Sequence, residues 1–261
     1  MGELALVTGA TSGIGAAYSW LLAKKGWDLV ITGRRRDIIE KRAEEIRTKF
    51  GVIVHVAILD FSNNEDFTAF KEQYLITKRY GFLVNCVGYS NHSNFFGTHF
   101  SINAKMIDVH INRMAEIIHM VVPGMKISGG TIVNVSSLAG FLPSLSDPFY
   151  SGTKSFINTY SESIAMILLR DNIVVQSLCP GFTKTDFHKN MNLDSRVFKN
   201  RGLKRWMTPK AVVNYSYKKL KPGKVIVIPG FFNKIIYFSL RFIPKKRYYK
   251  IAGRSRVLDE K

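Results

Sequence analysis

The chain has 261 residues, enough for one sizeable α/β domain but too few for that domain and a second enzyme module. Its hydrophobic content of 46% and charged content of 22% are ordinary for a globular protein and exclude an intrinsically disordered one. The formal net charge is +19, and nearly all of the excess lies in residues 184–261, which hold 21 Lys and Arg against 4 Asp and Glu.

Seven apolar, β-branched runs alternate with helix-length segments along the chain. The predicted strands are residues 4–8, 28–32, 52–59, 82–87, 130–136, 173–178 and 224–229. The predicted helices are residues 13–26, 36–50, 64–80, 102–126 and 150–171. Parallel strands need crossover connections that usually contain a helix, so this pattern predicts a sheet covered on both faces. The predicted fold is α/β, a single doubly wound Rossmann domain with a seven-stranded parallel sheet.

A glycine-rich turn at residues 8–15 directly follows the first apolar run. Gly9, Gly13 and Gly15 lie where the strand turns into a helix, and glycine there permits close approach of a pyrophosphate to backbone amides. The N-terminus of the helix then faces the negative charge. We therefore predict dinucleotide binding at this turn.

The type of dinucleotide depends on the end of the second predicted strand, where Gly33 precedes Arg34, Arg35 and Arg36. An acidic residue here would bind the ribose hydroxyls of NAD(H), whereas a guanidinium group suits the 2′-phosphate of NADP(H). NADP(H) is therefore the predicted cofactor. Alternatively, one or two of the three arginines simply belong to the exposed start of the next helix.

A serine, a tyrosine and a lysine have a spacing that suits proton transfer. Tyr150 and Lys154 are one helical turn apart, so the ammonium can lie beside the phenol and lower its pKa. Ser137 follows a predicted strand and can bind the substrate oxygen that Tyr150 protonates, with Ser136 as the competing candidate. The arrangement predicts hydride transfer at a carbonyl group.

Together these motifs resemble those of the short-chain dehydrogenase/reductases, in order and over nearly the whole chain. The resemblance rests on residues 8–15, 83–88, 134–154 and 180–185. Within the family, residues 134–140 look most like the branch that contains 17β-hydroxysteroid dehydrogenases and 3-oxoacyl-CoA reductases, together with its bacterial relatives.

The resemblance implies a role for each matched residue. Tyr150 would be the general acid in reduction, Lys154 would lower its pKa and hold the nicotinamide ribose, and Ser137 would orient the carbonyl. Ser137 and Tyr150 would thus bind the substrate. The implied cofactor-binding residues are Gly9, Thr11, Ser12, Gly13, Ile14, Gly15, Arg34, Asp60, Asn85, Gly88, Tyr150, Lys154, Thr183 and Thr185. No metal site is predicted.

One position departs from the family pattern. The family commonly completes the catalytic group with an Asn in a Val-Asn pair on the preceding helix, and Val109-His110 occupies that slot here. Asn112 is two residues further, about 200° around a helix, and presents another face. His110 either holds the water of a proton relay or is only a packed histidine, and both interpretations stay open at this point.

The C-terminal third mixes apolar and cationic residues. By resemblance, residues 186–222 form a lid over a lipophilic carbonyl substrate, after which residues 231–261 extend a catalytic domain at residues 1–230. Residues 231–243 are apolar and aromatic, but too short and interrupted to span a bilayer. They pack against the domain or a subunit, lie in a membrane interface with their cations toward anionic lipid, or help to admit a large substrate.

The sequence thus predicts an NADPH-dependent carbonyl reductase for a 3-oxoacyl thioester, a steroid-like compound or another lipophilic ketone. The alternative is a non-catalytic NADP-binding structural or regulatory protein whose basic tail binds a membrane or an acidic partner. Nucleic-acid binding is not expected, because no recognition module accompanies the charge. The separate Cys86 and Cys179 suit the cytoplasm, with peripheral association with a membrane as the alternative location. The resemblance implies a homodimer or homotetramer.

Overall fold

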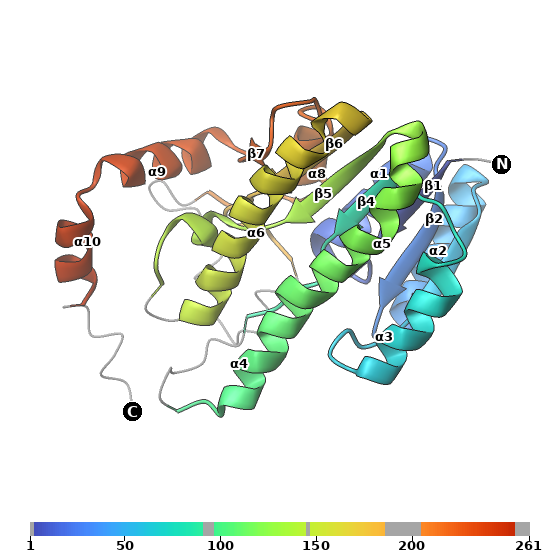
Figure 1. Cartoon of the computed structure of the whole chain (residues 1–261), viewed down its shortest axis with the longest axis horizontal. Coiled ribbons are helices and arrows are strands. Elements are labelled where there is room, and N and C mark those ends of the chain that lie inside the picture. Colours follow the sequence, from blue (N-terminus) through green and yellow to red (C-terminus); the bar gives the residue numbers. More distant parts are fainter. Residues whose placement is uncertain (1–2, 91–96, 145–146, 186–204, 254–261) are drawn as a thin grey trace.

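The computed structural model describes residues 3–90, 97–144, 147–185 and 205–253. Seven parallel strands form one sheet in the order β3-β2-β1-β4-β5-β6-β7, as Figure 1 shows. The strands are β1 (Leu4–Val7), β2 (Asp28–Gly33), β3 (Val54–Ile58), β4 (Phe82–Asn85), β5 (Gly130–Val135), β6 (Ile173–Leu178) and β7 (Ile226–Val227). The α-helices are α1 (Gly13–Lys24), α2 (Arg36–Phe50), α3 (Asn64–Phe70), α4 (Phe100–Ile107), α5 (Arg113–Ser128), α6 (Pro148–Ile167), α8 (Pro209–Tyr217), α9 (Phe231–Phe242) and α10 (Lys245–Ala252). The predicted α/β fold and its seven-stranded parallel sheet are confirmed.

The strand order reverses at β1, which pairs with β2 on one side and β4 on the other. Ligands of doubly wound sheets bind in the crevice at such a reversal, beyond the carboxyl ends of the strands. The glycine turn leaves β1 at this point. A Cβ atom on Gly15 would lie 2.3 Å from the Gly9 carbonyl oxygen, so only glycine allows this tight return into α1.

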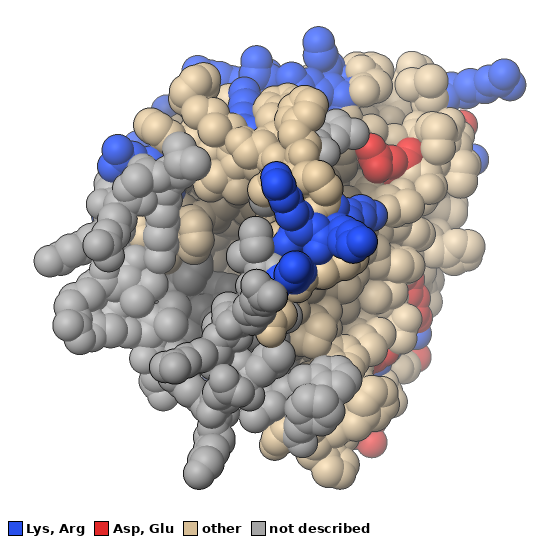
Figure 2. Space-filling view, turned by 90° about the vertical axis from the view of Figure 1, so that its left-hand side faces the viewer, with Lys and Arg blue, Asp and Glu red and all other residues tan. Residues whose placement is uncertain are grey.

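The C-terminal helices leave the sheet after β7. In Figure 1, α9 runs outward from the body and α10 follows at its far end. Figure 2 looks onto the side of the molecule that carries α10, and a group of Lys and Arg side chains stands near the centre of that face. Among the described residues, no helix has both the length and the apolar character needed to cross a bilayer.

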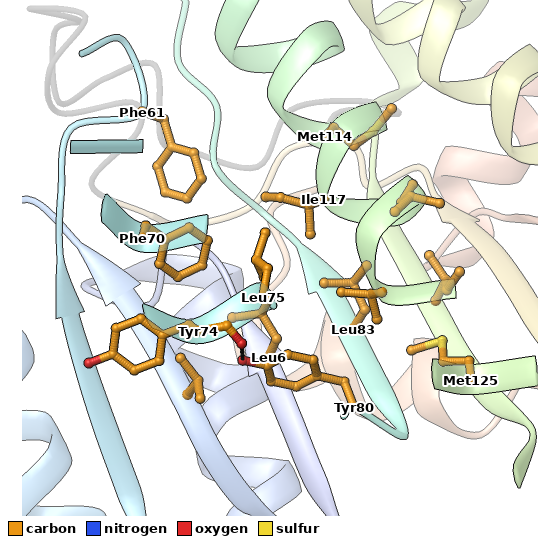
Figure 3. Close-up of a cluster of buried hydrophobic side chains, with 14 of the residues drawn as sticks. Leu6, Phe61, Phe70, Tyr74, Leu75, Tyr80, Leu83, Met114, Ile117 and Met125 are labelled. Carbon is orange, nitrogen blue, oxygen red and sulfur yellow. Dashed lines mark hydrogen bonds between the residues drawn. The ribbon is translucent and has the colours of Figure 1, made fainter. Parts of the chain in front are cut away.

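Two layers of helices bury the two faces of the sheet. Successive strand side chains point to opposite faces, so Leu6 packs with α3, α5 and α6, whereas Val7 packs with α1, α2 and α8. Figure 3 shows the first of these two clusters, in which Leu6 and Leu83 lie between aromatic rings and residues of α5 such as Ile117. Burial of these side chains fixes the sheet and therefore the position of its carboxyl edge.

Two predicted helices are interrupted by single turns of π-helix. The predicted helix at residues 64–80 is shorter in the structure, where α3 is followed by a π-turn at Lys71–Leu75. The buried Tyr80 then returns its hydroxyl to the Tyr74 carbonyl at 3.0 Å. The predicted helix at residues 102–126 is divided into α4 and α5 by a second π-turn at Asp108–Asn112. This second turn contains His110, and π-turns of this kind often mark functional sites.

Candidate active site

A cavity of about 440 Å³ opens at the carboxyl edge of the sheet, where the crevice is expected. Most of the predicted site residues line it: Gly9, Thr11, Ser12, Gly13, Ile14, Arg34, Asp60, Gly88, Ser137, Tyr150, Lys154, Thr183 and Thr185. Three predicted residues, Gly15, Asn85 and His110, do not. The fold therefore brings the glycine turn and the Ser-Tyr-Lys group, far apart in sequence, to one cavity.

The start of α1 faces this cavity. Ser12 is the N-cap residue of α1 and makes no side-chain capping bond within the described residues, while Gly13 and Ile14 line the cavity. A Cβ atom on Gly13 would lie 2.9 Å from the Thr185 side chain, so the turn and the segment after Pro180-Gly181 pack closely. The partial positive charge of the helix N-terminus is thus available to a phosphate.

The three consecutive arginines have different positions. Arg34 lines the cavity and its Nη1 is 3.4 Å from Oδ2 of Asp60, whereas Arg36 pairs with Glu40 along the surface of α2 at 3.0 Å. Arg35 also lines the cavity. Partial burial alone would raise the pKa of Asp60, but hydrogen bonds from the adjacent loop and the Arg34 charge leave that pKa below its ordinary value. Two guanidinium groups therefore border the cavity, and the third belongs to the helix surface.

Position 33 leaves no room for a side chain. A Cβ atom on Gly33 would lie 2.4 Å from Cγ2 of Thr11. An acidic residue that binds ribose hydroxyls would therefore displace Thr11, a residue of the glycine turn. Arg34 and Arg35, which follow Gly33, lie beside the cavity.

Ser137, Tyr150 and Lys154 meet on one side of the cavity. The Ser137 hydroxyl is hydrogen-bonded to the Tyr150 phenol. The Lys154 ammonium lies 5.6 Å from the centre of the Tyr150 ring and donates to the Val135 carbonyl at 2.9 Å. A substrate oxygen beside Ser137 would therefore also lie beside the phenol.

Burial controls the protonation of this group. It raises the pKa of Tyr150 to about 12, although the hydrogen bond with Ser137 opposes the rise. It also lowers the pKa of Lys154 to about 8. The sequence-based expectation of a lowered phenol pKa is therefore not met in this structure, because the ammonium is bonded to Val135 and burial dominates. A protonated phenol suits a proton donor.

The two adjacent serines are distinguished by their partners. The Ser136 hydroxyl is buried and donates to the Lys154 carbonyl at 2.9 Å, which ties β5 to α6. The Ser137 oxygen accepts from the Ala139 amide at 3.1 Å and bonds the Tyr150 phenol. The geometry favours Ser137 over Ser136 as the residue that contacts a substrate oxygen.

His110 uses both ring nitrogens in bonds within the protein. Its Nε2 accepts from the Tyr89 amide at 3.0 Å, and its Nδ1 lies 3.0 Å from the Thr153 hydroxyl. That hydroxyl donates to the Tyr150 carbonyl at 2.9 Å, so Nδ1 carries the proton. Burial, assisted by the Lys154 charge, lowers the pKa of His110 well below its ordinary value. The geometry favours a neutral, packed histidine over a relay, and Asn112 is exposed and bonded to Asp108.

Asn85 lies outside the cavity, although the resemblance assigned it to the cofactor. Its Nδ2 donates to Oδ1 of Asn134 at 2.9 Å, and the Asn134 amide donates in turn to Ser161 of α6 at 3.0 Å. The chain of bonds connects β4, β5 and α6. In this structure Asn85 thus has a structural position behind the site.

Asp147 is a site residue that the sequence analysis missed. It is buried, its Oδ1 accepts from the Tyr150 amide at 2.9 Å, and its Oδ2 accepts from the Ser90 hydroxyl. It is the N-cap residue of the helix that carries Tyr150 and Lys154. The signal was present, because Asp followed by Pro148 is typical of a helix start.

Most of the predicted lid lies outside the described residues, which resume at residue 205. Beyond that point, Trp206 is buried against Phe182, with ring centres 5.3 Å apart. The two predicted free thiols are both unpaired, with Cys179 buried and Cys86 partly exposed at the cavity.

The sequence matches the family model described as short chain dehydrogenase over residues 3–196. Very-long-chain 3-oxoacyl-CoA reductases from Anas platyrhynchos and Homo sapiens are each 34% identical to it over 194 residues. These matches cover 72% of this chain and 62% of each relative. The chain therefore aligns with less than two thirds of the length of these relatives.

Solved structures share the fold over nearly the whole chain. A short-chain dehydrogenase from Sphingobium yanoikuyae in complex with NADPH is 25% identical, with a TM-score of 0.81 over 97% of this chain and 96% of its own. A 7β-hydroxysteroid dehydrogenase structure is also 25% identical, with a TM-score of 0.85 over 97% of both chains.

Proposed function

Because this chain belongs to the short-chain dehydrogenase family, we propose that it is an NADPH-dependent reductase of a ketone on a lipophilic substrate. Membership of the family supports an oxidoreductase activity. The observation that carries the proposal is that Ser137, Tyr150 and Lys154 line the same cavity as the glycine turn. A cofactor bound at the turn and a ketone bound at Ser137 would then be neighbours.

The residues around the glycine turn fit NADP(H). The N-terminus of α1 suits the pyrophosphate. Arg34 and Arg35 suit a 2′-phosphate, and Gly33 has no side chain that would block its approach to them. When bound, NADPH supplies the hydride that reaches the carbonyl carbon. The NADPH bound in the similar structure from Sphingobium yanoikuyae supports this choice of cofactor.

The protein's own residues would handle the carbonyl oxygen. Ser137 donates a hydrogen bond to that oxygen, and Tyr150 gives it the phenolic proton as it gains negative charge. Lys154, with a pKa of about 8, is mostly cationic at neutral pH and stabilises the phenolate that remains. The carbonyl carbon gains a hydride and its oxygen a proton, so an alcohol is formed.

A 3-oxoacyl thioester is the substrate class that the relatives favour, because they are named very-long-chain 3-oxoacyl-CoA reductases. A steroid-like ketone is the second class, favoured by the 7β-hydroxysteroid dehydrogenase structure. The division into a catalytic domain at residues 1–230 with a lid at residues 186–222 belongs to the same proposal. So does the cytoplasmic location expected from the two free thiols.

Assembly as a homo-oligomer is also part of the proposal. Large apolar side chains on α5 and α6 are exposed. Ile127 is 69% exposed, Met166 73% and Ile167 70%. Exposed apolar patches on helices of a soluble enzyme indicate a contact with another chain. A second copy packed on these two helices would cover them.

The test is NADPH oxidation, followed by absorbance, with a panel of ketones and 3-oxoacyl thioesters. We expect turnover with at least one lipophilic member and its loss in Tyr150→Phe, which should still bind NADPH. Binding of NADPH without turnover of any member would favour the alternative, a non-catalytic NADP-binding protein. The intact Ser137, Tyr150 and Lys154 argue against that alternative.

A further inference from the structure

The C-terminal arm, defined here as residues 231–252 with α9 and α10, turns an apolar stripe away from the domain. Phe231, Ile235, Phe238 and Phe242 follow one another at spacings of four, three and four residues, so they share one face of α9. Phe231 is 72% exposed, Phe238 53% and Phe242 83%. A surface helix normally turns its apolar stripe toward the core, so this orientation requires a partner outside the domain.

The opposite face of α9 holds the arm on the domain. Asn233 is buried beneath the helix, and Tyr237 packs edge-on against Phe141 with ring centres 4.7 Å apart. Further along, the Tyr248 hydroxyl of α10 donates to the Pro143 carbonyl at 2.6 Å. The outward stripe is therefore the free face of a helix that is already anchored, and its exposure does not come from a detached helix.

Cations accompany the stripe. Lys245, Lys246, Arg247 and Lys250 of α10 are all exposed, and the sequence contains no Asp or Glu from Ser195 to Leu258. Figure 2 shows a group of Lys and Arg side chains on the side of the molecule that carries α10. The surface that the arm contacts must therefore be anionic as well as able to receive phenylalanine rings.

We propose that the C-terminal arm seats the protein on an anionic lipid bilayer, with α9 lying in the interface. Exposed aromatic residues on one face and Lys and Arg beside them are the composition of interfacial helices. At twelve residues α9 is too short to cross the bilayer, so it lies along the surface. A second copy of the chain is the weaker occupant, because a symmetric contact between two arms would bring their cations together.

The anchoring contacts also connect the arm to the active site. Asn233 packs on Gly181, where a Cβ atom would come 2.3 Å from Asn233 Oδ1, and Gly181 lines the cavity. Phe141 ends the short 3-10 helix Leu138–Phe141, whose N-cap residue is Ser137, and Pro143 follows two residues later. The arm that we propose to bind lipid therefore packs directly on a residue of the cavity wall. If the proposed function holds, a ketone dissolved in the membrane reaches Ser137 and Tyr150 from that surface.

Flotation with vesicles tests the arm. We expect the whole protein to float with vesicles that contain phosphatidylserine and to stay behind with phosphatidylcholine alone. Phe238→Ser combined with Phe242→Ser should lower the vesicle partition coefficient at least about tenfold, because two exposed rings are lost from the stripe. The matched control combines Ile53→Ser with Ile76→Ser, which are 56% and 69% exposed and lie outside the arm, and should float like the wild type.

The charge is tested by a second matched pair. Lys245→Ser, Lys246→Ser and Lys250→Ser together should weaken binding to the anionic vesicles and reduce its salt dependence. Replacement of Lys210, Lys218 and Lys221 by Ser removes the same number of exposed cations from the same basic third and should leave flotation unchanged.

Three outcomes overturn the proposal: no flotation of the wild type with anionic vesicles, equal flotation of the Phe238/Phe242 variant and its control, or a smaller assembly of that variant with unchanged flotation. The last outcome would assign the stripe to a contact between copies. NADPH oxidation with the panel of ketones and 3-oxoacyl thioesters, measured without vesicles, separates this proposal from the previous one. A protein that floats but reduces no ketone would support the membrane-binding arm and contradict the proposed reductase. A protein that reduces a ketone but does not float would support the reductase and contradict the membrane-binding arm.

Discussion

The Asp147 carboxylate caps the helix that carries Tyr150, with Oδ1 accepting the Tyr150 amide hydrogen at 2.9 Å. The same negative charge raises the pKa of the Tyr150 phenol, after the larger effect of burial. Asp147 therefore acts on the proposed proton donor in two ways, through the position of its helix and through its charge. Substitutions can separate the two.

Asp147→Asn keeps a capping oxygen and removes the charge. We expect nearly unchanged stability, and we expect the alkaline loss of ketone reduction to move to lower pH, because the phenol then loses its proton more readily. Asp147→Ala removes the cap as well and should lower the free energy of unfolding by about 1–2 kcal/mol. The pH profile of kcat and urea unfolding measure the two effects. A pH profile of the Asn variant identical to that of the wild type would contradict the assigned charge effect.

The serine pair gives a second prediction. Ser137→Ala removes the hydroxyl beside the phenol, so we expect kcat to fall by about 100-fold or more with little change in stability. Ser136→Ala breaks the bond to the Lys154 carbonyl and should cost about 1 kcal/mol of stability while most activity is retained. Steady-state kinetics and unfolding of both variants decide. If Ser136→Ala instead lost activity and Ser137→Ala lost only stability, Ser136 would be the residue that orients the substrate.

The neighbouring arginines give a matched pair for the cofactor. Arg34→Asp places a negative charge at the cavity and should weaken NADPH binding by about tenfold or more, while NADH binding is little affected or improved. Arg36→Asp changes the same charge on the helix surface, beside Glu40, and should leave the NADPH dissociation constant within about twofold. Fluorescence titration with both nucleotides measures this. Equal affinities of the two variants for NADPH would remove Arg34 as a reader of the 2′-phosphate.

Local patterns were sufficient to predict the sheet and the main cavity. Apolar β-branched runs bounded by turn residues indicate strands, and a four-residue spacing on a helix puts Tyr150 and Lys154 on one face wherever that helix lies. The same logic placed the glycine turn at the carboxyl edge of β1, since a turn directly after a strand must lie at its end. These features depend on neighbours in sequence.

Features that depend on tertiary contacts were not predicted. Asn85 stands opposite Asn134 in the register of β4 and β5, and this pairing turns its amide away from the cavity. The phenol pKa follows from burial, which spacing alone does not give. For residues 231–243 the sequence left three alternatives open, including a membrane interface, and the contacts of Asn233 and Tyr237 show that the apolar stripe of α9 faces outward.

His110 leads to a prediction about stability and pH. Its pKa in the folded chain lies well below the ordinary value, mainly through burial, so the unfolded chain binds more protons than the folded one below about pH 6.5. The free energy of unfolding should therefore fall as the pH falls through that value. Above it the ring is neutral in both states, and its contribution no longer changes with pH.

His110→Asn should remove this part of the pH dependence, which urea unfolding below and above about pH 6.5 measures. His119→Asn is the matched control, because His119 lies on the same stretch of helix but is exposed, and the wild-type dependence should persist. A packed role also predicts that kcat of His110→Asn falls by less than about tenfold, whereas a proton-relay residue would lose about 100-fold or more. A large loss of kcat with unchanged pH dependence of stability would restore the relay interpretation.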